Sequence, residues 1–397
     1  MTPALLISLA LLSAAAPLGT DMYLPSFVKM AQDLNTTAAA VQLTLSAFMI
    51  GMGVGQLFIG PISDSVGRRV PLIIGSLLFG VMAVACALTP SVTWLIVLRL
   101  VMGASGGVGV ALARAVVADL EQTSDAAKAF ALMMAIQGLA PVIAPVLGGV
   151  LSSWIGWRGI FIVLACFCLL MVLAVLFVVP ESLPPEKRHS GGPAQMLRDA
   201  RRVVANRWFV GYSIIFAVGF GVMFSYISAS PFVLQREYGL STLAYSITFG
   251  TNALIMAIVS MVTARLVGRF AIRSLLMVGL GILTVTVAGL VICGFVGATL
   301  PIVLVLLALT LAGIGLLLGN ATALAVDALH GEASGTGSGI MGAAQFLVAG
   351  VVSPLVGIGH PPLHSMSLVM GICMAITLGL GLPLTRRAAG SSAAEAH

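Results

Sequence analysis

Twelve apolar runs, each long enough to cross a bilayer as a helix, constrain this chain more than any other feature. A membrane-spanning helix needs ~17–25 apolar residues, and isolated Gly or Pro within it is tolerated. Only 8% of the 397 residues are charged and 59% are hydrophobic, so the bilayer itself must cover this surface. The sequence therefore predicts an all-α integral membrane protein with twelve transmembrane helices. The runs lie near residues 5–27, 40–60, 71–89, 94–117, 128–152, 158–180, 207–231, 243–264, 271–295, 300–322, 336–358 and 364–385.

Basic residues are distributed unevenly between the two sets of loops. With a cytoplasmic N-terminus, fifteen of the 19 Lys and Arg residues fall on the cytoplasmic side, and three fall outside: Lys29, Arg158 and Arg236. Cytoplasmic loops carry the excess of Lys and Arg, so this count predicts that both termini are cytoplasmic. The N-terminus lacks the basic segment of a signal peptide, and 5–27 is expected to be a retained span. We expect a multi-pass protein of the cell (inner) membrane.

The longest polar interval separates six spans from six. It predicts an N-terminal bundle over 1–180, a cytoplasmic linker over 181–206 and a C-terminal bundle over 207–397. Motifs recur in the same order in both halves, which predicts two pseudo-symmetric six-helix bundles with the substrate site at their interface. The pairs are Leu24-Pro25 with Ser230-Pro231, Gly67-Arg68 with Gly268-Arg269, Asp119 with Asp327, and Gln137 to Gly148 with Gln345 to Gly357.

Asp21 is the only charged residue in the first span. An ionisable group at membrane depth costs at least ~2.5–3.5 kcal/mol on insertion scales, so it should face a partner or a water-filled cavity. Burial disfavours the ionised carboxylate, which makes Asp21 a candidate proton carrier. The alternative is a structural role for Asp21, as an ion-pair or helix-end residue.

Arg99 lies at a similar depth in the fourth span. Asp21 is six residues from the outer end of span 5–27, and Arg99 is five residues from the outer end of span 94–117. At ~1.5 Å per residue, both lie ~8–9 Å below the outer surface. This predicts that Arg99 pairs with Asp21 and that loss of Arg99 lets Asp21 hold its proton to higher pH. The alternative for Arg99 is snorkelling to the interface.

Residues 60–69 read GPISDSVGRR and join the second and third spans. Gly and Pro suit a tight turn, and Asp64 next to Arg68 and Arg69 supplies a compact charged latch. Read as physics alone, an ordinary positively charged cytoplasmic loop explains the segment equally well. The pattern resembles the G-x-x-x-D-x-x-G-R-R/K signature of the major facilitator superfamily. We predict a gating network of Asp64, Arg68 and Asp119, with Gly60, Gly67 and Arg69 shaping the loop.

Further segments resemble the bicyclomycin/chloramphenicol-resistance (Bcr/CflA) branch of drug:proton antiporters. That resemblance implies that Asp21 is the coupling acid and that Arg99 is tied to proton coupling. The segments are Asp21-Met22-Tyr23-Leu24-Pro25, Arg99-Leu100-Val101-Met102-Gly103, Glu181-Ser182-Leu183-Pro184-Pro185-Glu186 and Ser230-Pro231-Phe232-Val233.

Residues 140–149 resemble the antiporter motif G-x-x-x-G-P-x-x-G-G. Pro145, Gly148 and Gly149 match it and are assigned to gating, whereas Ala140 and Ala144 replace two glycines. Small residues let helices pack closely, and Pro bends the span. Some multidrug relatives carry a second acid about two turns before the first; here that region offers Ser13, which argues against strongly cationic drugs.

Candidate substrate contacts come from aromatic and amide side chains within the spans. The stripe of Tyr212, Phe216, Phe220 and Phe224 repeats every four residues on one helical face; such a stripe is more often helix packing than a drug pocket. Buried amides form interhelical hydrogen bonds as readily as they bind substrate. The candidates are Tyr23, Phe220, Phe224, Tyr226, Asn252, Gln137 and Gln345.

The sequence lacks the signatures of several other classes of protein. There is no G-x-x-x-x-G-K-[ST] loop for ATP, no cluster suited to a metal, and no basic stripe suited to nucleic acid. The five cysteines all lie in apolar runs and lack metal-site spacing. We therefore expect a monomeric transporter without enzyme activity or cofactor, which exchanges protons for a small amphipathic drug. The alternative is a facilitative or proton-coupled metabolite transporter, or a passive channel.

Overall fold

The computed structural model describes residues 2–120, 124–188, 193–329, 334–359 and 361–385. Its long elements are all helices, which confirms the predicted all-α membrane fold. Eleven helical segments of the described chain are long and apolar enough to cross a membrane. Large apolar side chains cover the circumference: Phe58, Val285 and Phe177 are 64%, 72% and 83% exposed, as a lipid-facing surface requires.

The first half of the chain forms six spans from five long helices. α6 accounts for the difference, because its described apolar part, Gly138–Phe177, is 40 residues, about twice a single span. The chain breaks from helical geometry at Gly156, where φ is +67°, a value that glycine adopts without strain. Both predicted spans, 128–152 and 158–180, are therefore present, joined at this turn. The helices are α1 (Pro3–Asp21), α2 (Phe27–Asp33), α3 (Ala38–Val66), α4 (Arg69–Leu88), α5 (Val92–Leu120) and α6 (Ser124–Phe177).

The first span departs from the single helix predicted over 5–27. α1 ends at Asp21, and a 3-10 turn, η1 (Leu24–Ser26), leads into α2. Pro25 explains the break, because it has no N–H for the Asp21 carbonyl and its ring would collide with that carbonyl in a continued helix. The chain from Met22 to Phe27 is nevertheless fully buried. The break thus lies inside the protein and places Asp21 at a helix end.

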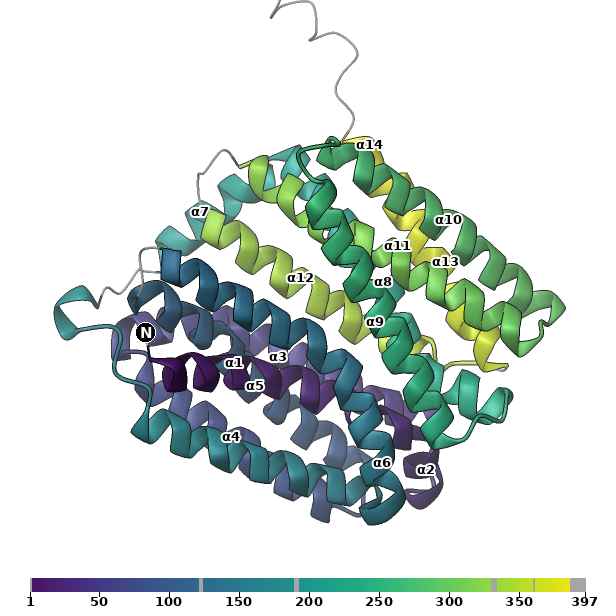
Figure 1. The fold of residues 1–397 in the computed structure, drawn as a ribbon, viewed down its shortest axis with the longest axis horizontal. Coiled ribbons are helices and arrows are strands. Elements are labelled where there is room, and N and C mark those ends of the chain that lie inside the picture. The colour runs from purple at the N-terminus through teal and green to yellow at the C-terminus, as the bar shows by residue number, and fades with distance from the viewer. Residues whose placement is uncertain (1, 121–123, 189–192, 330–333, 360, 386–397) are drawn as a thin grey trace, which may run out of the picture.

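The second half contributes six further spans. In Figure 1 its green-to-yellow helices lie together, beside the purple-to-teal helices of the first half. The linker carries a short 3-10 turn, η2 (Pro185–Lys187), and α7 (Pro193–Ala205). The domain boundaries and the internal repeat stay predictions. The elements are α8 (Arg207–Pro231), η3 (Phe232–Glu237), α9 (Thr242–Leu266), α10 (Ile272–Val296), α11 (Leu300–Asp327), α12 (Ser334–Leu355), α13 (Pro362–Ile376), η4 (Thr377–Gly381) and α14 (Leu382–Leu384).

The two halves meet where α3 packs on α12 and α6 packs on α9. We call the end of the molecule that carries Val66, Leu120 and Phe177 the linker side, and the opposite end the far side. Hydrogen bonds cross between the halves on the far side: Gln42 Nε2 donates to the Ser228 carbonyl over 3.0 Å, and Ser46 Oγ donates to the Gly350 carbonyl over 2.7 Å. Ser353 Oγ also donates to the Gln42 carbonyl, 3.1 Å away. The halves are therefore joined on the far side by uncharged polar contacts.

Candidate functional site

A cavity of about 620 Å³ lies between the two halves. This volume is typical of a site for a drug-sized ligand. Eight helices line it: α1, α3, α5 and α6 from the first half, and α8, α9, α11 and α12 from the second. Its walls are dominated by aromatic rings and methionines. These are Phe216, Phe220, Phe224, Tyr226, Phe249 and Phe346, and Met49, Met52, Met223, Met256 and Met341.

Asp21 lines this cavity at the end of α1. It is the only acidic side chain among the described residues that line the cavity, and Arg114 of α5 is the only basic one. Asp21 is 5% exposed, and no hydrogen bond or ion pair joins its carboxyl group to another described side chain. An acid at membrane depth that faces a cavity is the arrangement expected from the cost of exposing it to lipid.

Arg99 lies elsewhere, inside the first half. Its side chain is fully buried, and its guanidinium carbon lies 4.4 Å from the ring centre of Tyr23, 4.1 Å from that of Phe48 and 5.8 Å from that of Phe161. Cation–π contacts of this kind offset part of the cost of burying the charge. Nε and Nη2 of Arg99 have no hydrogen-bond partner among the described residues. The structure thus forms no ion pair between Arg99 and Asp21, and the role of Arg99 in proton coupling stays a prediction.

Four of the seven candidate substrate residues line the cavity: Phe220, Phe224, Tyr226 and Gln345. Tyr23 lies under the guanidinium of Arg99, its hydroxyl 3.2 Å from Thr44 Oγ1. Asn252 supports the cavity wall by donating from Nδ2 to the Tyr226 hydroxyl over 3.0 Å. The side chain of Gln137 lies outside the described residues. The sequence-based prediction missed the five methionines because they come from α3, α8, α9 and α12, and only the fold gathers them.

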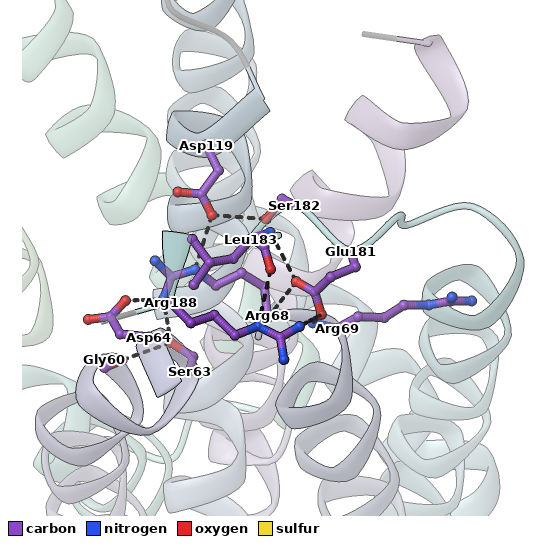
Figure 2. A network of polar contacts seen from close by, with 10 residues as sticks. All are labelled: Gly60, Ser63, Asp64, Arg68, Arg69, Asp119, Glu181, Ser182, Leu183 and Arg188. Carbon is purple, nitrogen blue, oxygen red and sulfur yellow. Dashed lines mark hydrogen bonds and ion pairs between the residues drawn. The ribbon is translucent and has the colours of Figure 1, made fainter. Parts of the chain in front are cut away.

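The loop between α3 and α4 holds the predicted charge network (Figure 2). Arg68 Nη1 lies 2.6 Å from Asp64 Oδ1, and Arg68 Nε lies 3.0 Å from Asp119 Oδ2. Burial lowers the pKa of Arg68, but its bonds to Asp119 and Asp64 outweigh this and raise the pKa above its usual range. The network joins the loop to the end of α5. Its gating role stays a prediction.

Glu181, just beyond α6, is a second anchor of this loop and was not among the predicted site residues. Its carboxylate accepts from the backbone N–H groups of Arg68 over 2.8 Å and Arg69 over 3.3 Å, so it caps the otherwise unsatisfied start of α4. Burial would raise the pKa of Glu181, but these N–H groups, with that of Leu183 and the Arg188 charge, hold it below its usual range. The available signal was the acid at the end of the sixth span.

Ser182 extends the network, because its hydroxyl donates to Asp119 Oδ2 over 2.9 Å (Figure 2). Gly67 turns the chain with φ of +100°, and a Cβ there would collide with the Glu181 carboxylate. A Cβ on Gly60 would meet open space, and the Gly60 carbonyl accepts a hydrogen bond from Ser63 Oγ over 2.9 Å. The start of the linker, the α3–α4 loop and α5 are therefore held together on the linker side.

The glycines of the 140–149 segment make two different contacts. A Cβ on Gly148 would overlap the carbonyl oxygen of Met22, at the break after α1. A Cβ on Gly149 would overlap Ser246 Oγ of α9, in the other half. Pro145 lies in α6 three residues earlier and is buried. Gly148 thus faces the first half, and Gly149 faces the interface.

Comparison with known proteins agrees with this geometry. The family model of the Major Facilitator Superfamily matches residues 9–354. An uncharacterised MFS-type transporter of Bacillus subtilis, YdgK, is 34% identical over 95% of this chain and 93% of its own length. A bicyclomycin resistance protein homologue of Haemophilus influenzae is 28% identical over 94% of each chain. A bacterial homologue of the lysosomal transporter Spinster, solved inward-facing and unoccupied, superposes with a TM-score of 0.75 over 97% of this chain and 96% of its own, at 16% identity.

Proposed function

Because the chain belongs to the major facilitator superfamily, we propose that it is a drug:proton antiporter that exports small amphipathic molecules from the cell. The observation that carries this proposal is the cavity wall: aromatic rings and five methionines surround a single acid. Methionine is flexible and polarisable, so such walls accommodate apolar molecules of varied shape. A site for a sugar would need many fixed polar partners instead.

Asp21 is the proposed proton carrier. In its protonated form it is neutral, and the cavity can close around it at low cost; once ionised, it favours a hydrated, open cavity. Proton uptake and drug binding would therefore alternate at the same cavity. Asp21 and the aromatic wall line the same cavity, so the proton site and the proposed drug site are close together. This supports an exchange in which the proton and the drug compete.

The proposed orientation places the linker side in the cytoplasm of a cell whose inner membrane holds the protein. The excess of Lys and Arg in the loops of that side supports this arrangement. The far-side contacts between the halves then correspond to a closed outer face. We propose that the protein acts as a monomer, since the cavity is built from one chain.

The test compares the parent with Asp21→Asn in a host that lacks its own drug pumps, and in proteoliposomes with an imposed proton gradient. The amide keeps the shape of the side chain but cannot titrate. Asp21→Asn should accumulate normally and fail to concentrate drug against a gradient. If it still exports drug uphill as the parent does, Asp21 is not the coupling acid. If the parent itself only equilibrates substrate, facilitative transport replaces the proposal.

A further inference from the structure

Asp21 is positioned by its backbone rather than by side-chain partners. No hydrogen bond or ion pair joins its carboxyl group to another described side chain, although the residue is only 5% exposed. Its direction is set by the end of α1 and the break that Pro25 imposes. Whatever holds that break in place therefore holds the acid.

Two contacts on one face of α6 hold the break. Gly148 lies against the carbonyl of Met22 so closely that a Cβ would overlap the oxygen, carbon and Cα of that residue. One turn further along α6, Ser152 Oγ accepts from Ser26 Oγ over 2.8 Å. Residues four apart share a face of a helix, so these contacts grip both ends of the segment between α1 and α2.

The neighbouring glycine contacts a different part of the protein. Gly149 points about 100° away around α6 and meets Ser246 Oγ and the Thr242 carbonyl of α9, in the other half. Its contact bears on how the halves close on the far side. The two adjacent glycines therefore make separate contacts: Gly148 packs on the break next to Asp21, and Gly149 packs on the other half.

We propose that Gly148 is a positioning residue for proton coupling, which sets the placement of Asp21 by seating the Met22 carbonyl directly on α6. This inference rests on the proposed drug:proton exchange. An alanine at 148 would meet only backbone atoms, which cannot rotate away, so the break must move off α6 and carry Asp21 with it. Among the described titratable or charged groups, Arg114 of α5 and Tyr226 of α8 line the same cavity as Asp21, Tyr245 of α9 interacts with it electrostatically, and Tyr23 follows it in the chain.

The experiment measures binding of chloramphenicol to purified protein between about pH 5 and 9, the range a perturbed carboxyl covers. Gly148→Ala should move the midpoint of pH-dependent binding to lower pH by about half a unit or more, because a displaced carboxyl gains hydration. It should also reduce proton-driven export at least tenfold. Gly149→Ala should slow export but leave the midpoint in place. Ser152→Ala adds no volume and should move the midpoint in the same direction by less.

Opposite results would overturn the proposal. An unchanged midpoint in folded Gly148→Ala, with pH-dependent binding in the parent, would make Gly148 a packing residue only. An equal shift in Gly149→Ala would mean that the two glycines act together. If Gly148→Ala does not accumulate, an unchanged midpoint in Ser152→Ala has the same force. A parent without any pH-dependent binding would instead refute the proposed antiport, and this inference with it.

Discussion

Arg99 shows at the scale of a residue what depth along a helix can and cannot predict. Counting residues gave the two side chains a similar depth, and the cost of exposing a charge to lipid predicted that Asp21 is covered by protein; both side chains are buried. It did not give the direction around each helix, and Arg99 turns into the rings of Tyr23, Phe48 and Phe161 while Asp21 turns into the cavity. Tyr23 is only two residues beyond Asp21, but it lies past the end of α1, in the break before η1, and its ring packs under Arg99.

Replacement of Arg99 by methionine should stabilise the protein. Two guanidinium nitrogens are buried without partners, and an unsatisfied buried donor costs ~1–3 kcal/mol. Methionine keeps much of the volume and sulfur packs well on rings, so Arg99→Met should raise the Tm of the purified protein. Arg99→Ala removes the same charge but leaves a cavity and should lower the Tm. A lower Tm in both variants would show that the cation–π contacts outweigh the burial cost.

Single residues also decided which boundaries of the elements could be predicted. The span predicted over 207–231 coincides with α8, Arg207–Pro231, because Asn206 caps its start. Pro25 caused the departure in the first span, because it breaks the helix inside an apolar run that hydropathy reads as continuous. Gly156 lies between the predicted spans 128–152 and 158–180 and supplies the turn that separates them. Hydropathy finds the membrane-spanning length but not the backbone geometry within it.

At the scale of the elements, Arg68 joins α3, α4 and α5 through two carboxylates of unequal burial. Asp119 is 21% exposed and Asp64 is 47% exposed, so the Asp119 pair is less screened by solvent. Asp64→Asn should slow turnover more than it weakens drug binding. Asp119→Asn should slow turnover more than Asp64→Asn does. Stopped-flow export and equilibrium binding measure the two effects. Equal losses of binding and turnover would count against a gating role.

The Glu181 cap on α4 predicts a dependence on pH. Because its pKa is held below the usual range, the carboxylate stabilises the loop at neutral pH, and this stabilisation disappears in acid, as the pH falls through the lowered pKa and Glu181 becomes protonated. Glu181→Gln should therefore lower the protection of the first turn of α4 against amide hydrogen exchange at pH 7, and this protection should no longer change in acid. Glu186→Gln, a change on the exposed η2 turn, is the matched control. Identical exchange in both variants would contradict the cap.

At the scale of the whole molecule, the fold brings together a site that no single span encodes. Phe220, Phe224, Tyr226 and Gln345 could be named from the sequence because aromatic and amide residues stand out in apolar helices. The methionines could not, because in the sequence they cannot be told apart from apolar residues that face lipid. Only the folded arrangement of eight helices brings them to one cavity. The chain also closes differently at its two ends, with hydrogen bonds between the halves on the far side and ion pairs within the first half on the linker side.

Ser353→Ala should loosen the far side. This hydroxyl donates to the Gln42 carbonyl over 3.1 Å and lies 2.7 Å from Ser228 Oγ, so its loss removes a buried hydrogen bond between the halves. Spin labels at the exposed positions Lys29 and Leu243, in a protein without its five native cysteines, should show longer and broader distances. Ser225→Ala removes an equally buried hydroxyl that bonds only its own helix, to Gly221. Unchanged distances in Ser353→Ala would exclude this contact from far-side closure.

In the proposed exchange, the electrical character follows from Asp21, because it is the only acid among the described residues that line the cavity. One proton entering for each neutral molecule that leaves moves one positive charge inward, whereas exchange for a monovalent cation moves none. A membrane potential of 100 mV would then contribute ~2.3 kcal/mol to the export of a neutral molecule. In proteoliposomes, a potassium diffusion potential, negative on the side from which the drug leaves, should accelerate export of chloramphenicol, whereas any export of the monovalent cation ethidium should not respond. Acceleration of ethidium export by the same potential would mean that more than one proton enters for each molecule that leaves.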